Sequence, residues 1–170
     1  MIKLEMEKYE MNDITLRQWI FRISALLWML IIFFFSAQPA TVSTQTSLTV
    51  GRKICSIFVR GYEEKSEKEK TELAEKIEYP IRKMAHATEY AILAILFLNA
   101  MTISAKNAVF ALLYTACYAM TDEFHQLFVP GRSGQITDVL IDTGGAICGI
   151  CLVYVIIKAK KVIWKSNDRR

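Results

Sequence analysis

The stretch WIFRISALLWMLIIFFFSA, residues 19–37, decides the class of this protein, because Arg22 is the only charged residue within it. A helix of about 20 mostly apolar residues spans the roughly 30 Å hydrocarbon core of a bilayer. The residues before it mix Lys with Glu and Asp, and no small-x-small cleavage site follows Phe35. These features do not fit a cleaved signal peptide, so we expect a retained membrane anchor.

The composition of the whole chain agrees with a membrane protein of one domain, residues 1–170. Of its 170 residues, 53% are hydrophobic and 22% are charged, which excludes disorder over most of the chain. Four cysteines without a pattern do not make a disulfide scaffold. The net charge of +4 is modest, and the basic residues lie beside predicted helix ends. We therefore expect membrane lipids, and no nucleic acid, as partners.

Three further apolar segments are long enough to cross the membrane only when polar residues at one end of each are included. They lie at about 83–103, 107–126 and 135–157. Together with 19–37 they predict an all-α integral membrane bundle of four transmembrane helices. The Gly145-x-x-x-Gly149 spacing in the last segment would let a neighbouring helix approach closely.

The connection at about 38–81 is predicted to be extracytoplasmic and partly helical. Residues 41–49 are rich in Ser and Thr and indicate a loop. Apolar residues recur at helical spacing over 50–60, which fits either a helix on the membrane surface or one packed on the other segments. The alternating charges of residues 61–79 favour a solvated helix.

The distribution of Lys and Arg favours both termini in the cytoplasm. Raw counts on the two sides are nearly equal, but residues close to helix ends weigh most and long loops cross regardless of charge. Lys158, Lys160, Lys161 and Lys165 follow the last segment closely. We therefore expect a multi-pass protein of the cell membrane with its long connection outside.

Costly polar residues lie at one end of each apolar segment. A charge inside a membrane segment costs about 2.5–3.5 kcal/mol on insertion scales, so such residues are candidates for function. The four segments supply Ser36 and Gln38; Arg82, Lys83, His86, Glu89 and Tyr90; Asp122, Glu123 and Gln126; and Asp138 and Asp142. With four crossings, the end of the first and third segments and the start of the second and fourth share one face, so these residues should meet in a shallow external site.

The character of this predicted site favours an anion. The N-termini of the second and fourth segments would point into it, and their free N–H groups and dipoles attract negative charge. Arg82, Lys83 and Arg132 add positive charge, and arginine can grip phosphate with two hydrogen bonds. The alternative is a buried polar network that only holds the helices together.

Three stretches resemble the VanZ-like family of bacterial membrane proteins: FSAQPA at 35–40, RKMAHATEYAILAIL at 82–96 and TDEFHQLFVPGRSGQITDVLIDTGGAICG at 121–149. The resemblance implies a small multi-helix membrane protein of a family named for a member linked to low-level teicoplanin resistance. Carried over by position, its motif residues are Ser36, Gln38, Lys83, His86, Glu89, Tyr90, Asp122, Glu123, Gln126, Pro130, Gly131, Arg132, Asp138, Gly145 and Gly149.

Three functions remain open from the sequence. The first is an envelope protein that binds an anionic lipid headgroup or cell-wall precursor through Ser36, Gln38, Lys83, His86, Glu89, Tyr90, Gln126, Arg132 and Asp142. The second is an enzyme acting on a phosphate-bearing lipid, with catalytic candidates His86, Glu89, Asp122, Glu123 and Asp138. In the second, Asp122, Glu123 and Asp138 could hold a divalent cation, although their spacing matches no metal signature and the sequence identifies no cofactor. The third is a purely structural network.

Overall fold

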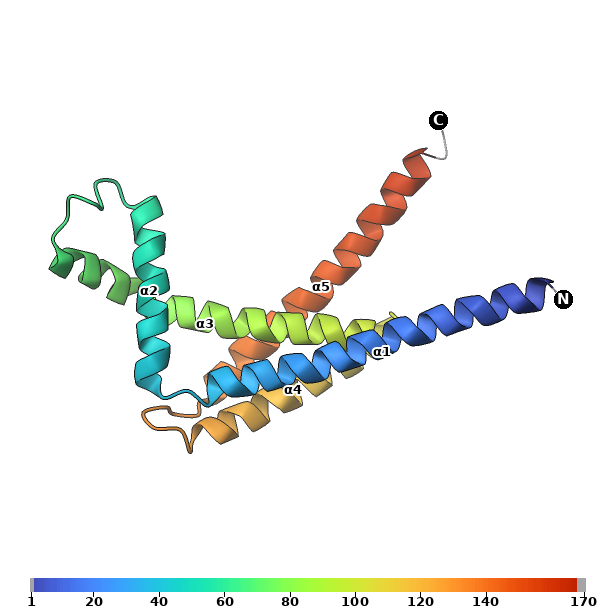
Figure 1. Cartoon of the computed structure of the whole chain (residues 1–170), viewed down its shortest axis with the longest axis horizontal. Coiled ribbons are helices and arrows are strands. Elements are labelled where there is room, and N and C mark those ends of the chain that lie inside the picture. Colours follow the sequence, from blue (N-terminus) through green and yellow to red (C-terminus); the bar gives the residue numbers. More distant parts are fainter. Residues whose placement is uncertain (1, 168–170) are drawn as a thin grey trace.

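The computed structural model describes residues 2–167 and contains five helices and no strand in that range. They are α1 (Ile2–Ser36), α2 (Ala40–Phe58), α3 (Glu67–Asn99), α4 (Ala105–Gln126) and α5 (Ile136–Asn167). The predicted all-α class is confirmed. Figure 1 shows α1, α3, α4 and α5 gathered in a bundle, with α2 lying across the end where α1 stops.

The bundle is organised around α3, which contacts each of the other four helices. Its closest partner is α5, and the two run in the same direction. A Cβ added at Gly145 would lie 2.0 Å from the Ala87 carbonyl oxygen, and one at Gly149 would lie 2.4 Å from that of Ala91. The expected close approach at these glycines is confirmed, since no side chain fits between the two backbones.

Aromatic side chains fasten α1 to α3 and to α4. The Trp28 indole Nε1 donates to the Glu89 carbonyl at 2.9 Å, and the Tyr118 hydroxyl donates to the Met29 carbonyl at 2.6 Å. Ile32 and Tyr90 are fully buried in the apolar cluster beside these bonds. The end of α1 is therefore held at a fixed position relative to α3 and α4.

Two helices are long and apolar enough to cross a membrane, over Thr15–Ser36 and Ile136–Lys165. Most residues in these two stretches are not buried in the protein. Neither α3 nor α4 meets the same test of length and composition among the described residues, because polar residues dilute their apolar runs. The structure thus supports membrane character and leaves the count of four crossings as a proposal.

The predicted loop at residues 41–49 is wrong, because α2 begins at Ala40 and is continuous to Phe58. Thr46 and Thr49 donate their hydroxyls to the carbonyls four residues earlier, so their side chains do not compete with the helix. Packing decides the rest: Gly51 is buried, and a Cβ there would lie 3.3 Å from the Ala74 carbonyl oxygen of α3. Tertiary contact has overridden weak helix propensity.

The sequence left two alternatives for residues 50–60, a helix on the membrane surface or a helix packed on the other segments, and α2 has features of both. Ser47, Gly51 and Cys55 are buried and form the packed face, whereas Ile57 and Phe58 are exposed. The helix therefore packs on α3 through small residues and still presents large apolar residues outward.

The predicted solvated helix and the second membrane segment are one helix. A capping box starts α3, because Ser66 accepts from the Glu69 N–H and Glu69 accepts from the Ser66 N–H. Pro80 lies inside α3 and removes one backbone donor without ending the helix. The sequence placed boundaries at 83 and 103, whereas the helix extends from Glu67 to Asn99.

Candidate functional site

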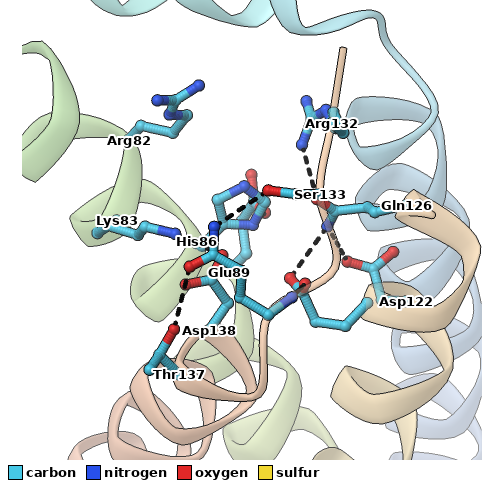
Figure 2. Close-up of polar contacts among 12 residues, drawn as sticks. Arg82, Lys83, His86, Glu89, Asp122, Gln126, Arg132, Ser133, Thr137 and Asp138 are labelled. Atoms are coloured by element: carbon cyan, nitrogen blue, oxygen red, sulfur yellow. Dashed lines mark hydrogen bonds and ion pairs between the residues drawn. The ribbon is translucent and has the colours of Figure 1, made fainter. Parts of the chain in front are cut away.

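The polar residues singled out from the sequence lie together at one end of the bundle, where α1 ends, α4 ends and α5 begins (Figure 2). The middle of α3 supplies Arg82, Lys83, His86 and Glu89 to this cluster. One expectation fails here. The N-terminus of α3 lies at Glu67, well before Lys83, so of the two helix N-termini expected at the cluster only that of α5 lies near it.

We call the close contact of Gly145 and Gly149 with the Ala87 and Ala91 backbones the α3–α5 seam. Toward the cluster, the contact between these two helices continues as an ion pair. Lys83 Nζ contacts Asp138 Oδ2, and the two side chains are only 16% and 14% exposed. Arg82 directly precedes Lys83, and its Nη2 lies 3.5 Å from Oε2 of Glu78, one turn earlier on α3. Two of the cations of the cluster are therefore already paired with carboxylates.

Arg132 differs from Arg82 and Lys83 because its partners are neutral. Its Nε donates to the Gln38 carbonyl at 2.9 Å, its Nη2 to the Phe35 carbonyl at 3.2 Å and its Nη1 to Gln126 Oε1 at 3.3 Å. Among the described residues, no carboxylate oxygen lies within ion-pair distance of it. Partial burial and the neighbouring Arg82 lower the pKa of Arg132, whereas Asp122, Glu123 and Glu89 raise it from a distance. An arginine remains protonated in proteins, so Arg132 keeps a positive charge that no carboxylate contacts directly.

A glutamine joins two carboxylates at the end of α4. Gln126 Nε2 donates to Asp122 Oδ2 at 3.1 Å and to Glu123 Oε1 at 3.2 Å. The second oxygen of Glu123 accepts from the Gln135 backbone N–H at 2.9 Å. All three side chains from α4 are buried. The amide thus orders both acids and, through Arg132, connects them to the end of α1.

His86 and Glu89 face the cluster without a hydrogen bond between them, since His86 Nδ1 lies 3.7 Å from Glu89 Oε2. These two atoms and several more buried polar atoms here have no hydrogen-bond partner among the residues the structure describes. They are Ser36 Oγ, His86 Nδ1, Glu89 Oε2, Asp122 Oδ1, Asp138 Oδ1 and both carboxylate oxygens of Asp142. Buried polar groups usually have partners, which can be other residues, ordered water or a bound group.

Two cavities open on the cluster and share Arg82, His86 and Arg132 in their walls. The smaller holds about 170 Å³ and is lined on one side by Lys83, Gln126 and Asp138. The larger holds about 350 Å³ and lies between α2, α3 and the end of α1. Arg132 therefore stands where the two spaces meet.

The predicted residues divide between the cavity walls and the layer beneath. Those in the walls are Gln38, Lys83, His86, Glu89, Gln126, Arg132 and Asp138. Those in the buried layer beneath are Ser36, Tyr90, Asp122, Glu123 and Asp142. All the residues that the sequence predicted for the site therefore lie together in the structure. Whether they bind a ligand stays a prediction.

Several wall residues were missed from the sequence. Ser43, Thr46 and Ser47 of α2 line the larger cavity, and Tyr79, Ser133 and Gln135 line the smaller. The hydroxyl residues belonged to the stretch interpreted as a loop, so nothing marked them as wall residues. A helical reading of 40–58 would have placed Ser43 and Ser47 on one face, one turn apart.

The carboxylates of the cluster are not arranged as a metal site. Among the side chains that the structure describes, no three from His, Cys, Asp or Glu are grouped as ligands for one ion. Asp122, Glu123 and Asp138 therefore do not form the cation site considered from the sequence. What the arrangement offers chemically is hydrogen-bond acceptors around one guanidinium whose direct partners are all neutral.

Residues 21–158 match the family model described as VanZ/LLP1. The chain belongs to this VanZ-like family. Because the match includes α1 from Phe21, all of α2 to α4 and most of α5, it covers every element that builds the site. Comparisons with curated proteins and with solved structures gave no match. The VanZ-like family and the two apolar helices together make this a membrane protein.

Proposed function

We propose that this VanZ-like protein is a multi-pass protein of the bacterial cell envelope whose polar cluster binds an anionic lipid headgroup or an envelope precursor at the outer membrane face. The observation that carries the proposal is Arg132, a charged guanidinium with only neutral partners at the junction of two cavities. A phosphate or carboxylate there would give Arg132 an anion in direct contact and form charge-assisted hydrogen bonds.

The lipid-binding proposal is tested by replacing Arg132. Native mass spectrometry of the detergent-purified protein would count bound phosphatidylglycerol and, as the neutral reference, bound phosphatidylcholine. A hydrogen bond to a charged group contributes about 1.5–3 kcal/mol, so Arg132→Gln should weaken phosphatidylglycerol retention about 10- to 100-fold. Arg132→Lys, which keeps the charge, should retain part of it. Equal retention of both lipids by the unaltered protein would overturn the proposal.

The topology we propose has four transmembrane helices, with α3 from about residue 83 and α4 added to α1 and α5, and with both termini in the cytoplasm. Large apolar side chains on the outer surface of α4, such as Val109, Leu113 and Phe124, support its contact with lipid. The lysines after residue 157 on α5 support a cytoplasmic C-terminus.

Cysteine labelling tests the topology. In a background with Cys55, Cys117, Cys148 and Cys151 replaced, Ser133→Cys lies at the polar end and Thr102→Cys at the opposite end of the bundle. A membrane-impermeant maleimide added to intact cells should label position 133 and leave position 102 unlabelled. Labelling of position 102 alone would show that the orientation is the opposite of the proposed one. Labelling of both positions would contradict the count of four transmembrane helices.

A second function, an enzyme acting on a phosphate-bearing lipid, is favoured by one pair of residues. His86 and Glu89 both line the larger cavity beside Arg132, which is the arrangement of a general base or acid next to an anion site. A lipid profile of cells with and without the gene separates the two functions. A phosphate-lipid species that changes with the gene, and no longer changes with Glu89→Gln, would identify the enzyme.

A link to glycopeptide resistance follows if the bound group is an envelope precursor. If the protein binds an anionic precursor at the outer face, it would change how a peptide antibiotic such as teicoplanin reaches its target. Expression of the chain should then shift teicoplanin susceptibility, and Arg132→Gln should remove that shift without removing the protein from the membrane.

A further inference from the structure

An apolar groove lies directly beside the polar cluster, between the end of α4 and the start of α5. It holds about 220 Å³, and its apolar walls are Met120, Phe124, Leu127, Ile136 and Val139. Glu123, Gly134 and Gln135 complete the lining. Its outer rim is exposed, with Phe124 at 64% and Ile136 at 83%. In a bundle that spans a membrane, such a rim faces lipid.

The groove and the smaller polar cavity are separated by one layer of side chains. Gln135 lines both spaces. Glu123 stands between them, because one of its carboxylate oxygens accepts from Gln126, a wall residue of the polar cavity, and the other accepts from the Gln135 backbone. The exposed side chain of Gln135 is held only by polar contacts to Ser133 and Thr137. The two spaces thus meet at the Gln135 rim.

The close packing of the loop on α4 keeps this groove short and fixed. A Cβ added at Gly134 would lie 2.4 Å from the Glu123 carbonyl oxygen and 3.0 Å from Leu127 Cδ2. Only glycine allows the chain to pass so near the end of α4 before α5 begins. Gln135 is consequently fixed at the boundary between the apolar and polar spaces.

We infer that the groove between α4 and α5 holds the hydrocarbon chain of the amphiphile whose anionic headgroup occupies the polar cavities, so that the ligand enters sideways from the bilayer. This inference rests on the proposed headgroup binding and adds to it: the ligand must carry a chain, and it is delivered from the membrane and not from the aqueous phase. The Gln135 rim is where chain and headgroup would join.

The groove is expected to place the chain beside the polar cavities without adding much binding free energy. Lipid tails around the bundle are as apolar as Met120 or Val139, so a chain gains little free energy by moving from the bilayer into the groove. The groove instead lets the chain stay in an apolar environment while the headgroup moves over Gln135 to Arg132. Filling the groove should therefore exclude chain-bearing ligands and leave short anions unaffected.

Met120 and Leu113 offer a matched pair of positions for the test. Both lie on α4, and both side chains are 52% exposed, but only Met120 lines the groove. We expect Met120→Trp to lower retention of dioleoyl phosphatidic acid about tenfold by native mass spectrometry, a steric loss of roughly 1.4 kcal/mol. Leu113→Trp should leave this retention unchanged, and binding of glycerol 3-phosphate, which has no chain, should be the same in both variants.

Photo-crosslinking provides the second measurement, in nanodiscs of phosphatidylcholine that contain phosphatidic acid with a diazirine in its acyl chain. Crosslinks should concentrate on Met120, Leu127 and Val139, and Arg132→Gln should remove them while crosslinks to Leu113 persist. If phosphatidic acid is retained in an Arg132-dependent way but crosslinks spread evenly around α4, the groove inference is wrong and the headgroup proposal stands. If retention never depends on Arg132, the headgroup proposal itself fails.

Discussion

The same two helices, α3 and α5, meet in two very different ways within three turns. Along the seam, Gly145 and Gly149 lie against the Ala87 and Ala91 backbones with no room for a side chain. At the polar end, the contact is between charged side chains, Lys83 and Asp138, and further buried polar atoms nearby have no partner. The seam has a single close-packed arrangement, whereas the polar end keeps unused hydrogen-bonding capacity.

This difference indicates that the seam positions the helices, whereas the polar end is the part available for binding. A seam made of backbone contacts fixes the axial register of α3 against α5, and that register decides that residue 83 lies opposite residue 138. The polar end can then keep unsatisfied groups near Arg132, because the seam supplies the packing that the polar end lacks. Gly145→Val and Gln126→Leu each remove a contact from one side of this comparison, and Arg52→Ala removes a solvent-exposed ion pair that belongs to neither side.

The largest effect is expected at the seam. Gly145→Val would direct a branched side chain at the Ala87 carbonyl, and the two backbones would have to separate. We expect a loss of about 3 kcal/mol or more in stability, seen as a large drop in detergent melting temperature and in yield. Gly144→Ala is the matched control, because a Cβ there meets nothing within 4 Å. A stable Gly145→Val variant would show that the seam does not set the register.

The second effect concerns the hydrogen bonds at the polar end. Gln126→Leu removes the donor shared by Asp122 and Glu123 and the acceptor for Arg132 Nη1. Leaving buried polar groups without partners costs about 1–3 kcal/mol each, so stability should fall by about 2 kcal/mol in a thermal melt.

Another residue of α4 supplies the control for Gln126→Leu. Leu113 is 52% exposed and lines neither the groove nor the two polar cavities, so Leu113→Met should change stability little. Phosphatidylglycerol retention should also fall in Gln126→Leu, because Arg132 loses one of its three fixed partners. Unchanged retention alongside reduced stability would mean that the network serves assembly alone, which is the third function left open by the sequence.

The polar end could be foreseen from the sequence, since each apolar segment has its costly residues at one end and the topology brings those ends together. The seam could also be foreseen, from the spacing of Gly145 and Gly149. The role of α2 could not, because its helix depends on burial of Ser47 and Gly51 against α3 and not on a local signal. The continuity of α3 was missed for a related reason: Pro80 and a change from charged to apolar residues indicate a boundary, yet one lost hydrogen bond does not end a helix held on both sides by packing.

The smallest effect is expected where charges meet in water, at the contact between α2 and the first turns of α3. Arg52 Nη1 lies 3.0 Å from Glu67 Oε2, and the Glu67 side chain is 73% exposed. Hydrogen bonds from Lys70 and Arg52 lower the pKa of Glu67 below its usual 4.5. A lowered carboxyl pKa stabilises the fold above that usual value, and the contribution is lost as the pH falls through the lowered pKa.

Exposed pairs contribute little, so Arg52→Ala should shift the melting temperature only slightly at pH 7. The Arg52→Ala and unaltered proteins should converge as the pH falls below 4, because protonated Glu67 no longer attracts Arg52. Arg52 Nη2 also donates to Thr71 Oγ1, a bond that does not titrate, so a residual difference at low pH would measure that contact. An effect at pH 7 as large as that of Gln126→Leu would contradict the comparison, because it would give a solvated ion pair the weight we assign to the buried polar end.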